Sequence, residues 1–270
     1  MSAVRFVALC LGVAGLAACT TTTTTTTGGD LVSSTTSRPG DKLSEAEVRK
    51  RARARTDLAA GYLRNGQYAV ALEETRRAVS IDPGFGDAYG MLGLIYMGLG
   101  ERALAEENFQ RSLKLEPGSP DLNNNYGWYL CQTGREREAI AYFQRALTDP
   151  LYSTPEKANQ NAGICYLQIR DYANAELYLR RAFEADASNA STKYELARLY
   201  LATGRLDRAA FYYGLLTKSV EPSATSIWLG LRIARAQGNL RGESQFASEL
   251  RQRYPSSPEA ALLARGAFDE

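Results

Sequence analysis

The chain has 270 residues, of which 44% are hydrophobic and 23% charged, a composition ordinary for a globular protein of one or two domains. Its 32 Lys and Arg and 30 Asp and Glu leave a net charge of +2. This balance argues against nucleic-acid binding, which relies on many cationic phosphate contacts. The absence of histidine excludes Ser-His-Asp and Cys-His catalysis and any His-ligated metal site. With no phosphate-binding loop or metal-ligand cluster in the sequence either, we expect no enzyme, no cofactor, no metal and no small-molecule substrate.

Residues 1–18 predict a secretory signal peptide, because an early cation, Arg5, precedes an apolar run over 6–18 that is too short to span a bilayer. The run ends in Leu-Ala-Ala-Cys at Cys19, which resembles a bacterial lipobox. The resemblance implies cleavage before Cys19 and lipidation of its sulfur. The alternative is an ordinary signal peptide with an incidental cysteine.

Residues 19–43 predict a flexible tether, since eight threonines are followed by a Gly-, Ser- and Thr-rich stretch that can bury no core. The residue after Cys19 is Thr20 rather than Asp. By resemblance to Gram-negative lipoproteins, this implies an outer-membrane location facing the periplasm, and the several acyl chains of such a lipoprotein hold it stably.

The rest of the chain repeats with a period close to 34 residues. One column holds small residues such as Ala59 and Gly93, which let two helices approach closely, while aromatic residues such as Phe109 suit the space between neighbouring repeats. Seven residues after each small residue comes a turn, where glycine allows the left-handed conformation that ends the first helix. The turn column consists of Gly66, Gly100, Gly134, Arg170, Gly204 and Gly238.

These columns resemble the tetratricopeptide repeat, which implies an all-α, right-handed superhelical solenoid over residues 44–270. The sixth repeat departs most, with Leu231 and Glu243 in place of small residues, and two extra residues between repeats three and four predict a looser joint. The expected repeats are 52–85, 86–119, 120–155, 156–189, 190–223 and 224–257, with a capping helix in 258–270.

Two cysteines remain in the mature chain, Cys131 at the twelfth position of repeat three and Cys165 at the tenth of repeat four. An offset of two residues rotates a helical side chain by about 200°. If one position faces the following repeat, the other faces the preceding one. In an oxidising periplasm this predicts a Cys131–Cys165 disulfide, with two buried free cysteines as the alternative.

Three segments around these cysteines are more specific than a generic repeat requires. They are NNYGWYLCQ over 124–132, PLYSTP over 150–155 and NAGIC over 161–165. Together with the lipobox and the six repeats, they resemble the type IV pilus biogenesis and stability lipoproteins called PilF or PilW, over essentially the whole mature chain.

The resemblance implies a pilotin-like assembly factor that helps the pilus secretin of the outer membrane to be localised or assembled into its multimer. Some members of the family are associated instead with stability or function of the assembled pilus. The expected partners are the secretin, other pilus assembly proteins and, through the lipid, the outer membrane. The alternative is a general periplasmic scaffold lipoprotein for cell-wall or outer-membrane assembly machinery.

Function without catalytic groups must be carried by a surface, and a solenoid offers the concave face lined by its first helices. The second, fifth, ninth and twelfth positions of each repeat line that face. Apolar residues there predict anchors for a partner segment, with amides to fix its backbone, although each apolar residue could instead pack between first helices. Glu73, Glu74, Glu106 and Glu107, on second helices, predict solvated faces rather than acid–base pairs. The candidate binding residues are Leu63, Leu94, Met97, Asn124, Trp128, Gln160, Tyr194 and Arg198.

Overall fold

The computed structural model describes residues 43–268, which form thirteen α-helices and, within that range, no strand. The predicted signal peptide, the lipidated Cys19 and nearly all of the tether lie outside the described residues. No helix in 43–268 has the length and apolar character needed to cross a membrane. The helices are α1 (Glu45–Arg64), α2 (Tyr68–Ile81), α3 (Gly86–Gly98), α4 (Arg102–Leu115), α5 (Pro120–Gln132), α6 (Glu136–Ala146), α7 (Pro155–Gln168), α8 (Tyr172–Ala185), α9 (Ala190–Ala202), α10 (Leu206–Ser219), α11 (Ala224–Ala236), α12 (Leu240–Arg253) and α13 (Pro258–Arg265).

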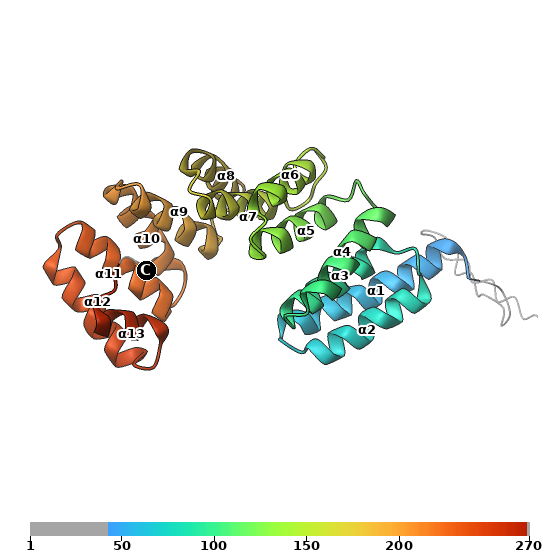
Figure 1. The fold of residues 1–270 in the computed structure, drawn as a ribbon, viewed down its shortest axis with the longest axis horizontal. Helices are drawn as coiled ribbons and strands as arrows, with labels where there is room; N and C mark the ends of the chain where they lie inside the picture. The colour runs from blue at the N-terminus through green and yellow to red at the C-terminus, as the bar shows by residue number, and fades with distance from the viewer. Residues whose placement is uncertain (1–42, 269–270) are drawn as a thin grey trace, which may run out of the picture. The chain divides into compact units, whose positions relative to one another are not determined.

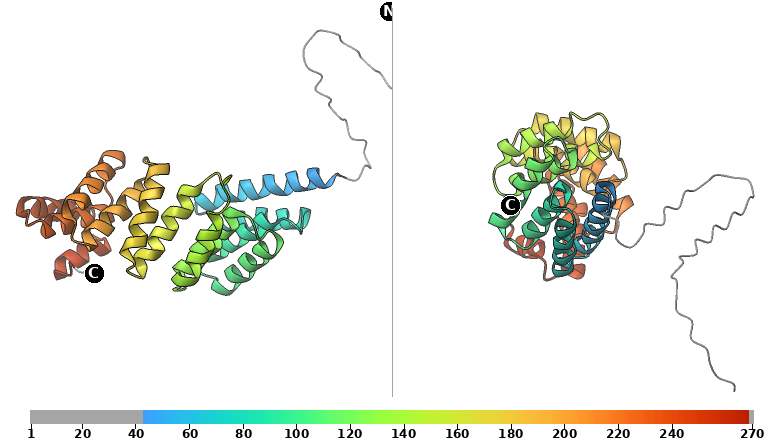
Figure 2. Two further views of the ribbon diagram at one scale, coloured as in Figure 1. Left: turned by 90° about the horizontal axis from the view of Figure 1, so that it is seen from above. Right: turned by 90° about the vertical axis from the view of Figure 1, so that its right-hand side faces the viewer.

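The helices stack as six successive pairs, each made of an odd-numbered helix and the even-numbered helix that follows it (Figures 1 and 2). Neighbouring odd-numbered helices contact one another all along the stack, whereas in the described part of the chain no two even-numbered helices do. The odd-numbered helices therefore lie on the inner side of the stack. The predicted all-α solenoid of tetratricopeptide-type pairs is confirmed.

The turn column adopts the backbone conformation that the sequence predicts. Gly66, Gly100 and Gly134 have φ between 70° and 82°, in the left-handed region. Arg170 occupies the same region with φ 59°. The N–H after each turn residue donates to a carbonyl near the end of the first helix, as Asp171 does to Tyr166 at 2.9 Å. Arg170 thus closes its helix in the same way as glycine, at a steric cost that glycine does not have.

Replacing Arg170 with glycine is expected to raise the free energy of unfolding by about 1 kcal/mol, because it removes the Cβ clash of the left-handed conformation. The matched control is Gly134→Ala, at φ 82° with open space around the added Cβ, which is expected to lower stability by a similar amount. Urea unfolding followed by circular dichroism measures both. A destabilised Arg170→Gly variant would contradict the expectation.

The small residues of the repeat bring the two helices of each pair together. A Cβ added to Gly93 would lie 2.6 Å from Cδ1 of Phe109, and one added to Gly127 would lie 2.8 Å from Cε1 of Phe143. Phe109 also contacts Tyr129 of the next repeat, with ring centroids 5.3 Å apart. The predicted roles of the small and aromatic columns, within and between repeats, are therefore confirmed.

The joint between repeats three and four is packed rather than loose, contrary to expectation. Tyr152, from the longer connection between α6 and α7, is 7% exposed and packs between Ala146 and Ala158. Burial raises the pKa of Tyr152 to about 12. The extra residues thus supply a side chain that fills the space they open.

The ends of the solenoid also differ in detail from the expected repeats. Helix α1 begins at Glu45, well before residue 52, and Ser44 caps it by accepting from the N–H of Glu47. In the sixth repeat Leu231 is fully buried, and Gly230 allows α11 to approach α10 of the fifth repeat, since an added Cβ would clash with the ring and hydroxyl of Tyr213. The capping helix α13 packs on α11 and α12.

The prediction of solvated glutamates is wrong for two of the four residues. Glu106 of α4 pairs with Arg135 at 2.6 Å and accepts from the hydroxyl of Tyr126 at 3.1 Å, which ties repeat two to repeat three. Burial opposes its ionisation, but these hydrogen bonds outweigh burial and hold the pKa of Glu106 below 4.5. Glu74 is 7% exposed and pairs with Arg55 at 2.7 Å. Both carboxylates are structural ion-pair partners.

Candidate functional site in the concave groove

A groove of about 500 Å³ runs across the first helices of the first three repeats and reaches α7. It is open to solvent on the inner side of the stack, where the odd-numbered helices contact one another. Of the predicted binding residues, Leu94 and Asn124 line it. Its lining consists of Arg53, Thr56, Asp57, Phe85, Asp87, Met91, Leu94, Asp121, Leu122, Asn124, Asn125 and Lys157.

Sequence reasoning missed a regular part of this lining. Asp57, Met91 and Asn125 each stand at the sixth position of their repeat, and all three line the groove. The signal for them was present, since the sixth position lies one helical turn after the second and shares its face. The sixth position therefore joins the four predicted ones in lining the concave face. It adds two polar residues, Asp57 and Asn125, and one apolar residue, Met91.

The groove is lined by apolar side chains together with polar and charged ones. Leu94 and Met91 are partly exposed within it, beside the carboxyl groups of Asp87 and Asp121. Burial first, and then the negative charge of Glu116 and Asp121, raise the pKa of Asp87. This arrangement suits an apolar side chain of a partner, with polar groups around it.

Two cationic residues also line the groove. The Arg53 guanidinium lies 5.9 Å from the ring centroid of Phe85, and Lys157 contributes to the lining from α7. The arginine is therefore held over an aromatic face rather than in an ion pair with the aspartates.

The two predicted amides already have partners inside the solenoid. Asn124, 5% exposed, accepts from Nδ2 of Asn161 at 3.0 Å, which joins α5 to α7. Gln160 donates to Ser191 at 2.8 Å and accepts from Asn189 at 3.0 Å, which joins α7 to the start of α9. Both amides therefore tie neighbouring first helices together, and their binding of a partner segment stays a prediction.

The remaining predicted residues lie outside this groove. Leu63 packs against the cluster of Ala59, Ala71 and Ile95, and Met97 and Trp128 are partly buried against the main core. Much of the surface of these three side chains is therefore covered by packing within the solenoid, which was the alternative to partner binding. Tyr194 is partly buried, and the guanidinium of Arg198 lies 5.9 Å from its ring centroid, in the second half of the solenoid.

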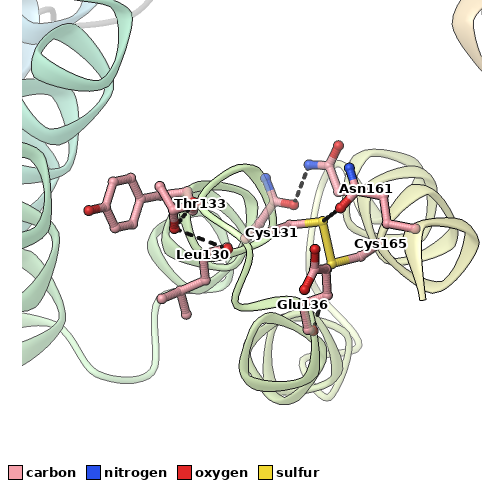
Figure 3. Close-up of a disulfide and its surroundings, with 9 residues drawn as sticks. Leu130, Cys131, Thr133, Glu136, Asn161 and Cys165 are labelled. Carbon is pink, nitrogen blue, oxygen red and sulfur yellow. Dashed lines mark hydrogen bonds between the residues drawn. A yellow bond between two sulfur atoms is a disulfide. The ribbon is translucent and has the colours of Figure 1, made fainter. Parts of the chain in front are cut away.

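A disulfide joins α5 and α7 close to the groove (Figure 3). The sulfurs of Cys131 and Cys165 are bonded, with a Cα–Cα distance of 5.8 Å, which is typical of disulfides. Both side chains are buried, so the bond lies in the core between repeats three and four. The Asn161–Asn124 hydrogen bond crosses the same pair of helices (Figure 3).

Within residues 43–268 no group of three Cys, Asp or Glu side chains is arranged to hold a metal ion. The charged residues of the groove stand beside leucine and methionine side chains that can be covered by a partner.

Comparison with known proteins places the chain in a family. Tetratricopeptide repeat families match residues 91–154 and 166–221. The crystal structure of PilW, described as a widely conserved type IV pilus biogenesis factor, is 34% identical, with a TM-score of 0.74 over 79% of this chain and 98% of that one.

The type IV pilus assembly protein PilF of Pseudomonas aeruginosa PAO1 is 27% identical over 230 residues, covering 85% of this chain and 91% of PilF. A solved structure of Pseudomonas aeruginosa PilF matches 82% of this chain and 99% of that one with a TM-score of 0.71 and 26% identity. These similarities extend over nearly the full length of the relatives and include the solenoid that carries the groove. The chain therefore belongs to the PilF/PilW family of tetratricopeptide-repeat proteins of type IV pilus biogenesis.

Proposed function

We propose that the protein is a pilotin-like lipoprotein that binds the type IV pilus secretin and promotes its localisation and assembly into a multimer at the outer membrane. The observation that carries the proposal is the match to PilW over 98% of that chain, together with a groove on the concave face in which Leu94 and Met91 are partly exposed. A binding groove in a pilus biogenesis protein calls for a protein partner within the same machinery.

Deletion of the gene tests the proposal. In the deletion strain we expect a loss of secretin multimer and of twitching motility together, both restored by a plasmid copy. A normal multimer with lost motility would instead assign the protein to a later step of pilus function. Normal levels of both would refute the secretin role and favour a general periplasmic scaffold.

The lipid anchor is proposed at Cys19, on the sequence Leu-Ala-Ala-Cys that resembles a lipobox. Cys19→Ser is expected to release the protein from the outer-membrane fraction, because the acyl chains that hold it would be absent. Cell fractionation and immunoblotting measure this. The matched control is Cys10→Ser, which changes a cysteine of the apolar run but leaves Cys19 in place. Sedimentation of Cys19→Ser with the outer membrane would show that another element anchors the chain.

A further inference from the structure

A second groove lies on the same inner side, over the first helices of repeats four to six. It consists of two adjoining pockets of about 330 Å³ each, which share Leu201, Ala202 and Arg232. It is lined by different residues from the groove of the first three repeats.

The charge of this second groove is of one sign. Arg170, Arg198, Arg232 and Arg235 line it, and among residues 43–268 no Asp or Glu lines either pocket. Two of these four arginines have carboxylate partners. Arg198 pairs with Glu195 at 2.7 Å, and Arg235 pairs with Glu243 at 2.6 Å.

The other two arginines of the groove have no carboxylate partner in the described part of the chain. Arg170 and Arg232 form no ion pair there, and Arg232 is partly buried. A partly buried guanidinium without a carboxylate keeps several hydrogen-bond donors free for an anion. The groove therefore carries an excess of positive charge at a site that a ligand can reach.

Apolar side chains lie between these cations. Leu167 and Leu201, both partly exposed, line the pocket that contains Arg170, and Phe268, whose ring centroid is 4.0 Å from the Arg235 guanidinium, lines the other. A free inorganic anion would leave these apolar surfaces uncovered. A ligand that fits must carry both carboxylates and apolar groups.

The spacing of the arginines fits an extended chain. Arg198 and Arg232 both stand at the ninth position of their repeats, on α9 and α11, which contact each other. Packed helices lie about 8–10 Å apart, a distance that an extended segment covers in about three residues.

We propose that this arginine groove binds an extended, acidic segment of a partner protein in which carboxylates alternate with leucine-like residues. Guanidinium groups bind carboxylates through paired hydrogen bonds, which sets the orientation of the segment. The proposal does not depend on the secretin being that partner.

Fluorescence anisotropy on the full mature chain tests the proposal. The probe is a labelled peptide of four Glu-Leu-Ser repeats, and the reference peptide replaces each Glu with Gln. We expect the glutamate peptide to bind at least tenfold more tightly, with an affinity that falls as salt is raised. Arg232→Glu is expected to reduce its affinity at least tenfold. The matched control is Arg241→Glu, an exposed arginine of α12 outside the groove.

Arg170→Gly separates binding from folding, because it is expected to stabilise the fold while removing one of the two unpaired guanidiniums. Weaker peptide binding by this more stable variant would support the proposal. Equal affinity for the two peptides, no measurable binding, or unchanged binding by Arg232→Glu would overturn it. So would phosphatidylglycerol vesicles that pellet the protein in an Arg232-dependent way while the peptide does not bind, since the arginines would then serve a lipid surface.

Discussion

Removal of the disulfide is expected to lower the free energy of unfolding by about 3–4 kcal/mol, because the bond closes a loop over a sequence separation of 34 residues and so restricts the unfolded chain. The variant is Cys131→Ala with Cys165→Ala. Alanine is suitable because both positions are buried, where the hydroxyl of a serine would lack a partner. Urea unfolding followed by circular dichroism measures the change.

The wild-type protein under reducing conditions is the matched control, and it should unfold with nearly the same midpoint as the alanine variant. Solenoid repeats contact only their neighbours, so the loss should concentrate in α5 to α8. Hydrogen exchange should then increase most in these four helices. Equal stability of oxidised and reduced protein, or two free thiols found in the exported protein by mass spectrometry, would contradict the expectation.

The fold follows from the sequence because each repeat column has a local physical reason. A left-handed residue ends the first helix, so the turn column could be aligned even where Arg170 replaces glycine. Small residues such as Gly93 mark where helices touch. The packed joint could not be predicted, since nothing in the spacing indicates that Tyr152 turns inward to fill it.

The candidate site was harder to predict from the sequence than the fold was. Helical periodicity assigns a face to each residue, and it placed Leu94 on the concave face correctly. It does not identify hydrogen-bond partners on neighbouring helices. The hydrogen bonds by which Asn124 and Gln160 join adjacent first helices were therefore not predicted. Glu106 was assigned to solvent for the same reason. Its partner Arg135 lies 29 residues away in sequence, and helical periodicity cannot predict such a pair.

The positive charge of the arginine groove could not be predicted from repeat position either. Arg198 was selected for its position in the repeat. That no carboxylate of residues 43–268 lines the groove beside Arg232 depends on which side chains the folded helices bring together. The position of a residue in its repeat predicts which way its side chain points. The net charge of the groove depends on all the side chains that the folded helices bring together. Arg232→Glu in the arginine groove and Leu94→Glu in the groove of the first three repeats therefore test two separate surfaces.

Leu94→Glu is expected to weaken binding of the secretin by roughly 30-fold or more, because a buried apolar anchor typically contributes about 2 kcal/mol or more. The added carboxylate would also stand in the groove lined by Asp87 and Asp121. The secretin multimer should fall toward the level of the deletion strain. Immunoblotting of the multimer in cells and a binding assay with purified secretin measure the two effects.

The matched control is Leu104→Glu, the same change at a 40% exposed leucine on α4 outside the groove, which should leave the multimer normal. Trp128→Ala, on the neighbouring helix, is expected to have a smaller effect because its side chain is partly packed against the core. Each variant must first match the wild type in helicity and melting temperature, since Leu94 also contacts the core. A folded Leu94→Glu variant with a normal multimer would show that the secretin binds elsewhere. The even-numbered helices, which present other leucines such as Leu177 to solvent, would then be the surface to mutate next.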